Sequence, residues 1–195
     1  TLECRGITLS DKQTKICVPI TGTDLEEIKE QAEKIANMNP DVVEWRADFY
    51  DVKNNDETEF EQCLKAINDN LKKIPIIYTY RTSNEGGEKS IDVDEYCRLC
   101  KYVSEISEKY NVAMIDVELY ENKDRKDIGK LLLDIKSTGV KVIGSNHHFE
   151  GTPSEKDIFN VLKTMEEAGA DICKIAVMPK EKVDVKTLIN ASKKA

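Results

Sequence analysis

Two hydrophobic periodicities alternate along almost the whole of this 195-residue chain. Short apolar runs with the two-residue repeat of a β-strand are each followed by a longer segment whose apolar residues recur every three or four positions, as on one face of an α-helix. One strand and one helix together occupy roughly thirty residues, which is the length of one βα unit. A chain that repeats this unit forms a parallel sheet covered by helices, so the predicted fold class is α/β.

Six such units follow one another. The predicted strands are residues 15–20, 41–46, 76–81, 114–118, 140–147 and 171–177. The apolar faces of the first five predicted helices begin at Leu25, Phe60, Tyr96, Ile128 and Ile158, and a sixth, less regular helix begins at about Lys182. Asp24 and Ser154 stand at positions typical of helix N-caps, with Asp157 as a cap partner for the latter. Residues 2–15 are compatible with a small N-terminal hairpin.

The regular repeat favours a (β/α)8 TIM barrel over a doubly wound sheet, because the sequence has no glycine-rich phosphate loop. A closed barrel of this type needs eight units and commonly about 250 residues. This chain provides only about six units. We therefore expect a single barrel domain over residues 1–195 that is incomplete at its C-terminal end, with two open sheet edges.

Lys174 interrupts a nearly apolar segment, residues 171–179. In a buried strand an ammonium group loses its hydration, which lowers the pKa of such a group and makes a nucleophilic amine available near neutral pH. This is the requirement for Schiff-base catalysis on a carbonyl substrate. The alternative is a lysine that turns back to solvent at a strand end or pairs with a carboxylate.

Polar side chains also occur at the carboxyl ends of other predicted strands. By the two-residue period they fall on one face in pairs, which are Glu44 with Arg46, Thr79 with Arg81, Asp116 with Glu118, and Ser145 with His147. Strands covered on both faces should be almost wholly apolar, so charge repeated at their carboxyl ends indicates an active site built from several strands. A salt-bridged layer without chemistry is the alternative.

His147 is one of two histidines and the natural proton carrier near pH 7. The strand period directs His147 inward and turns His148 away. Glu85 lies in a loop whose two following glycines permit close approach of the backbone. A carboxylate there could hold the imidazole in one tautomer. Otherwise the histidine is a satisfied polar residue and the glutamate is solvated.

Charge and cysteine usage restrict the partners. A formal net charge of -8 argues against nucleic acid or an anionic membrane. The longest apolar runs are strand-sized, so no transmembrane segment is predicted, and no secretion signal opens the chain. Cys97 and Cys100 share a helix face but lack two further ligands at zinc spacing. We therefore expect that the protein has no metal site, that its thiols are reduced and that it is located in the cytoplasm.

At these positions the chain resembles the type I 3-dehydroquinate dehydratases of the shikimate pathway. The matching blocks follow the family order over nearly the whole chain and are residues 44–48, 79–83, 85–88, 115–119, 145–147, 152–153, 168–171 and 174–179. The joint match is highly specific. The chain departs from the family pattern at His148, where many members have aspartate, and at Pro19, where several have serine.

The resemblance implies a (β/α)8 barrel enzyme, usually a homodimer, that needs neither metal nor cofactor. It makes Lys174 the Schiff-base lysine, His147 the general acid and base, and Glu85 the carboxylate partner of His147. The substrate would be 3-dehydroquinate and the product 3-dehydroshikimate, an intermediate of aromatic amino-acid biosynthesis. The positions that match substrate-contacting residues are Glu44, Arg46 and Arg81.

Two other hypotheses stay open. One is another Schiff-base barrel lyase of the class I aldolase type, which would act on a hydroxyketone capable of retro-aldol cleavage. The other is a non-catalytic, incomplete-barrel fragment. In the resembling family the arginine that binds the substrate carboxylate comes from the last two strands and their loops. We therefore expect the 195-residue chain by itself to be nearly inactive.

Overall fold

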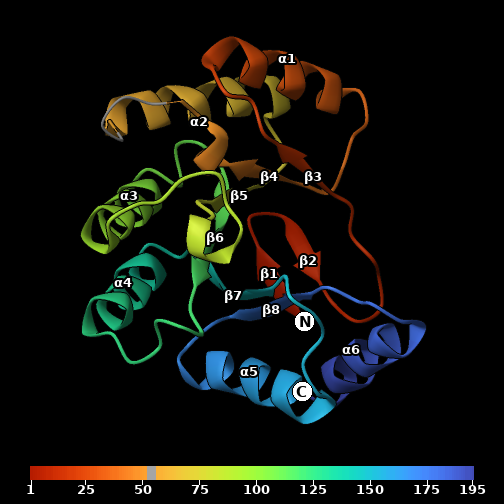
Figure 1. The fold of residues 1–195 in the computed structure, drawn as a ribbon. Coiled ribbons are helices and arrows are strands. Elements are labelled where there is room, and N and C mark those ends of the chain that lie inside the picture. The colour runs from red at the N-terminus through yellow and green to blue at the C-terminus, as the bar shows by residue number, and fades with distance from the viewer. Residues whose placement is uncertain (52–55) are drawn as a thin grey trace.

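A computed structural model, which describes residues 1–51 and 56–195, shows six parallel strands that curl into part of a barrel, with helices along the outside (Figure 1). The strands are β3 (Cys17–Ile20), β4 (Val42–Arg46), β5 (Ile76–Thr79), β6 (Val112–Glu118), β7 (Lys141–His148) and β8 (Ile172–Val177). They stand in the sheet in chain order, without the reversal that defines a doubly wound fold. The predicted α/β architecture, part of a TIM barrel, is confirmed.

The helices lie close to the predicted positions. They are α1 (Leu25–Ala36), α2 (Glu57–Leu71), α3 (Val93–Glu105), α4 (Lys126–Ser137), α5 (Glu155–Glu167) and α6 (Lys182–Lys194), with short 3-10 turns η1 (Ala47–Phe49) and η2 (Ser83–Glu85). The side chains of Asp24 and Ser154 accept hydrogen bonds from the backbone N–H of the third helical residue, as the sequence predicted. A capping box formed by Glu181 and Asp184 starts α6, whose apolar face alone was a weak signal.

Strand β5 is shorter than predicted and ends at Thr79 instead of Arg81. The backbone N–H of Arg81 donates to Oδ1 of Asp48 at 3.2 Å, so this residue leaves the strand ladder. Pro19 lies in β3, which pairs only with β4 in the described part of the chain.

The predicted N-terminal hairpin is present as β1 (Leu2–Cys4) paired antiparallel with β2 (Ile7–Leu9). It packs against the amino ends of the barrel strands, where Cys4 and Ile7 join Val42, Ala113 and Met114 in one apolar cluster. The Cys4 thiol donates to the carbonyl oxygen of Ala113 at 2.9 Å. The hairpin therefore covers the amino ends of the strands and leaves the carboxyl ends open.

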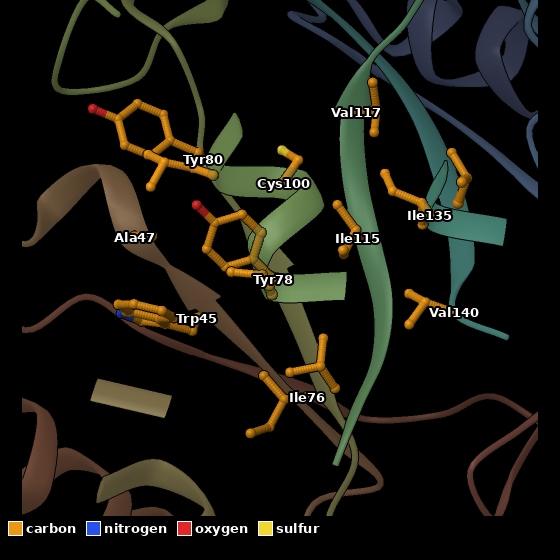
Figure 2. Close-up of a cluster of buried hydrophobic side chains, with 14 of the residues drawn as sticks. Trp45, Ala47, Ile76, Tyr78, Tyr80, Cys100, Ile115, Val117, Ile135 and Val140 are labelled. Carbon is orange, nitrogen blue, oxygen red and sulfur yellow. The ribbon is translucent and has the colours of Figure 1, made fainter. Parts of the chain in front are cut away.

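The main core lies between the sheet and the helices (Figure 2). The Trp45 ring contacts Phe60 and Tyr78 with centroid distances of 5.6 and 5.7 Å, which joins β4 and β5 to α2. All seven residues of β6 are buried, whereas every residue of β8 is partly exposed. This difference follows from position, because β6 is central and β8 has only β7 as a neighbour in the described sheet.

A groove of about 720 Å³ lies at the open side of the sheet. Its lining includes Cys17 of β3 and Lys174 of β8, together with residues of α5 and α6 such as Leu162 and Leu188. Both strands at the ends of the sheet therefore contribute to it. Among the described residues, no helix combines the length and hydropathy required to cross a membrane.

Candidate active site

All six predicted site residues line one cavity of about 230 Å³ at the carboxyl end of the sheet. They come from β4, from the segment after β5, from β7 and from β8. Parallel strands bring their carboxyl ends to one edge, which explains why residues far apart in the sequence meet here. The six are Glu44, Arg46, Arg81, Glu85, His147 and Lys174.

His147 is paired with Glu85. Its Nδ1 atom lies 2.8 Å from Oε2 of Glu85, and the two side chains are 10% and 6% exposed. A carboxylate at this distance favours the tautomer that carries a proton on Nδ1, which leaves Nε2 as a proton acceptor. The geometry thus fits the predicted partnership of a general base with a carboxylate that orients it.

The loop around Glu85 requires its glycines. Gly86 has a φ of +81°, and a Cβ atom there would lie 2.2 Å from Cζ of Phe149. A Cβ atom on Gly87 would lie 1.8 Å from the carbonyl oxygen of Arg81. The Phe149 ring in turn stacks on His147 with centroids 6.5 Å apart. The close backbone approach that the sequence predicted is therefore present in the loop that places Glu85 beside Nδ1 of His147.

The sequence pattern predicted that Lys174 is desolvated, and this prediction is wrong for the described structure. Its side chain is 41% exposed, because β8 is an edge strand in the described residues. Its Nζ atom lies 3.5 Å from Oδ2 of Asp116, whose side chain is only 2% exposed. The alternative of a lysine paired with a carboxylate is the arrangement observed.

Arg81 is almost fully buried within an acidic cluster. Its guanidinium lies 2.9 Å from Oδ1 of Asp116 and 3.2 Å from Oε1 of Glu118, and it donates to Oγ of Ser145 at 3.0 Å. Burial alone would lower the pKa of Arg81, but the Asp116 and Glu118 carboxylates outweigh it and raise this pKa. Part of the polar set is thus a salt-bridged layer that fixes Arg81 at the cavity wall.

Asp48 is a site residue whose role the sequence reasoning missed. Its buried carboxylate accepts hydrogen bonds from Nε and Nη2 of Arg46 at 2.8 and 2.7 Å and from the backbone N–H groups of Arg81 and Glu88, both at 3.2 Å. The hydrogen bond with Asp48 also raises the pKa of Arg46. Asp48 therefore aims Arg46 into the cavity and ties it to the loop that carries Glu85. Its place just beyond a strand end gave no periodic signal.

Glu44 is oriented by its neighbour on β5, since Oγ1 of Thr79 donates to Oε1 of Glu44 at 2.8 Å. His148 does not line the cavity that contains Lys174, whereas His147 does. This difference agrees with the predicted strand register.

All six cysteines are free, and Cys97 and Cys100 both lie on α3. In the described ranges, no three or more histidine, cysteine, aspartate or glutamate side chains are grouped so that they could hold a metal ion.

Comparison with known proteins identifies the family. The family model of type I 3-dehydroquinase matches residues 16–195. The chain belongs to the type I 3-dehydroquinase family. A relative named 3-dehydroquinate dehydratase from Clostridium novyi is 36% identical over 192 residues, which cover 98% of this chain and 74% of that protein. A relative of the same name from Bacillus licheniformis is 39% identical over 195 residues, with 98% and 73% coverage.

A solved structure supports the same assignment. The type I 3-dehydroquinate dehydratase from Clostridium difficile, described with covalently modified comenic acid, superposes on this type I 3-dehydroquinase with a TM-score of 0.91 at 36% identity. The match covers 98% of this chain and 74% of that one. The family resemblance and the barrel fold predicted from the sequence are both confirmed.

Proposed function

We propose that this chain is a hydro-lyase that dehydrates 3-dehydroquinate to 3-dehydroshikimate in the shikimate pathway, through an imine on Lys174. The observation that carries the proposal is that Lys174 and the His147–Glu85 pair line a single cavity in a member of the type I 3-dehydroquinase family. A nucleophilic amine and an oriented proton carrier are the two groups that this chemistry requires.

The roles follow from the chemistry of the substrate. The Lys174 amine adds to the C3 ketone, and His147 donates a proton to the carbinolamine hydroxyl, which leaves as water. The resulting iminium ion acidifies the neighbouring C2 proton, and His147 is left neutral. His147 removes this proton through Nε2, and the electron pair is stored in the enamine. The enamine then expels the C1 hydroxyl, which takes a proton from His147 and leaves as water. Hydrolysis of the product imine releases 3-dehydroshikimate and restores the amine.

Substrate binding is assigned to Glu44, Arg46 and Arg81. The carboxylate of Glu44 and the guanidinium of Arg46 lie at the cavity and can bond the ring hydroxyls of 3-dehydroquinate. Arg81 is 4% exposed and is paired with Asp116 and Glu118. We therefore propose that it shapes the cavity wall and contacts the substrate ring from there.

We further propose that two additional βα units complete the barrel. In the described residues β3 and β8 each have one neighbour, and the groove between them is lined by partly exposed apolar side chains such as Ile172 and Ile175. Two units would pair with both edges and cover this surface.

We also propose that the protein is located in the cytoplasm and forms a homodimer. The free cysteines are consistent with a reducing compartment.

Borohydride trapping tests the covalent step. When 3-dehydroquinate and borohydride are added together, a reduced adduct should form on Lys174 and be located by peptide mass spectrometry. Lys174→Arg should abolish trapping, because a guanidinium stays protonated and is no nucleophile. Lys141→Arg is the matched control, since Lys141 begins β7 and pairs with Asp171 at 4.0 Å, away from the cavity. Adduct on Lys141, or on no lysine, would contradict the assignment.

A turnover assay tests the domain proposal. The 195-residue chain by itself should be nearly inactive, and a C-terminal extension of roughly sixty residues, or two βα units, should restore activity. Ordinary dehydratase turnover by a cooperatively unfolding 195-residue monomer would show that six strands suffice. Cleavage of a hydroxyketone in place of dehydration would favour the aldolase-type alternative.

A further inference from the structure

Asp116 carries no role in the reaction described above, yet its carboxylate faces the proposed nucleophile. We propose that Asp116 is the counter-ion of the positively charged nitrogen at Lys174, first in the ammonium ion and then in the iminium ion. This inference rests on the proposed imine chemistry, and it adds a residue that acts directly on the reacting nitrogen.

The two oxygens of Asp116 have different partners. Oδ1 accepts a hydrogen bond from Oγ of Ser145 at 2.6 Å and lies 2.9 Å from Nη2 of Arg81. Oδ2 is buried and has no hydrogen-bond partner, and its neighbouring cation is Nζ of Lys174 at 3.5 Å. A buried carboxylate oxygen without a hydrogen bond is costly unless a charge or a donor faces it. An N–H group on the Lys174 nitrogen, in the ammonium ion or in the iminium ion, can satisfy Oδ2 of Asp116.

The other acids of the site are engaged elsewhere. Glu85 bonds His147, Glu44 accepts from Thr79, and Glu118 accepts from the Thr82 hydroxyl and N–H. Among the ion pairs of the described residues, Lys174 has Asp116 as its one carboxylate within 4.0 Å.

The cations at the site are Arg46, which is bound to Asp48, and Arg81, which shares Asp116. His147 faces Glu85 from β7. Because the other charged groups of the site are paired with one another, we assign Asp116 as the anion that faces the nitrogen of Lys174.

A fixed carboxylate suits this nitrogen because the charge is conserved when the imine forms. An ammonium ion and a neutral ketone give an iminium ion and water, so one positive charge stays on the nitrogen. The charge disappears only while the C2 proton resides on His147, and it returns when the hydroxyl departs. Asp116 therefore favours the protonated imine, which withdraws electrons from C2, over the neutral imine, which does so poorly.

A chromophoric aldehyde tests the inference independently of dehydration. Cinnamaldehyde forms a conjugated imine with an amine, and the protonated imine absorbs at a longer wavelength than the neutral one. The spectrum of the 195-residue chain is recorded against pH, with Lys174→Arg as the background for other lysines. In Asp116→Asn the midpoint of imine protonation should fall by at least about one pH unit. At a fixed pH, the ratio of protonated to neutral imine would then be about tenfold lower.

Glu118→Gln is the matched control, since Glu118 lies on the same strand and pairs with Arg81 but not with Lys174. Its midpoint should stay within a few tenths of a pH unit of the unchanged chain. Asp116→Glu should restore most of the protonated form. An unchanged midpoint in Asp116→Asn, or equal falls in both variants, would overturn the inference.

Folding of each variant is checked by cooperative thermal unfolding. If Asp116→Asn fails to fold, Asp116→Ser, which keeps a hydroxyl beside Arg81, provides the same measurement with the same expected fall. A chain that forms the aldehyde imine with a midpoint set by Asp116 but never dehydrates 3-dehydroquinate would refute the proposed function and support the counter-ion. Absence of any imine at Lys174 would refute both.

Discussion

Nδ1 of His147 and Oε2 of Glu85 lie 2.8 Å apart although the two residues are 62 positions apart in the chain. The contact joins the end of β7 to the short turn η2 after β5, so it forms only when the strands are assembled. It gives the imidazole a fixed orientation and leaves Nε2 for the substrate. The proposed catalytic role of His147 thus depends on a loop that belongs to a different βα unit.

Glu85→Gln should lower kcat by about tenfold or more while changing KM less, because the amide cannot stabilise the imidazolium ion as a carboxylate does. Steady-state kinetics, with each substitution made in the chain extended by two βα units, measure both constants. Glu88→Gln is the matched control, since Glu88 lies in the same loop with an exposed side chain. Equal losses in the two variants would mean that the loop, rather than the carboxylate, is what matters.

His147→Ala should lower turnover by on the order of a hundredfold or more, the usual scale of general acid and base catalysis. His148→Ala should have a mild effect, because His148 does not line the cavity that holds Lys174. The same turnover assay compares the two. If both variants lost activity to the same extent, a two-histidine site would have to be considered.

Gly87→Ala should lower the free energy of unfolding by on the order of 3 kcal/mol, because the new Cβ atom would overlap the Arg81 carbonyl oxygen at 1.8 Å. Gly129→Ala is the control, in which the free energy of unfolding should rise instead of fall. Gly129 is exposed within α4 and a Cβ atom there meets nothing within 4 Å, so alanine should stabilise the chain by roughly 0.5–1 kcal/mol. Denaturant unfolding of both variants measures these changes, and similar values for the two would contradict the prediction.

Burial raises the pKa of Glu118 from 4.5 to about 7, even though hydrogen bonds from Thr82 act in the opposite direction. Between these two values the folded chain binds more protons at this residue than the unfolded chain. The free energy of unfolding therefore falls as the pH rises from about 4.5 to about 7, by on the order of 2 kcal/mol from this group.

Glu118→Gln removes the titration while keeping an oxygen that can accept from Thr82. Its unfolding free energy should decline less steeply than that of the unchanged chain across the same pH interval. Urea unfolding at a series of pH values provides the comparison. Parallel curves would show that Glu118 titrates at similar pH in the folded and unfolded chains.

The sequence determined the order of the strands and helices, because hydrophobic periodicity and capping are local properties. It also determined which residues gather at the site. Parallel strands place their carboxyl ends together, so Glu44, Arg46, His147 and Lys174 could be assigned to one cavity without knowledge of the packing. The helix caps at Asp24 and Ser154 were equally readable, since each depends on residues within one turn.

Only the tertiary structure decided how these groups are held. Asp48 connects β4 to the Glu85 loop through hydrogen bonds to residues 33 and 40 positions away, and no periodic signal encodes such a contact. The exposure of Lys174 depends on which strands flank β8, which its own apolar sequence cannot specify. The pairing of Lys174 with Asp116 depends on the register of β6, β7 and β8, because Ser145 stands opposite both Glu118 and Lys174 in neighbouring strands. Electrostatic environment is a property of the assembled site, whereas periodicity belongs to the chain.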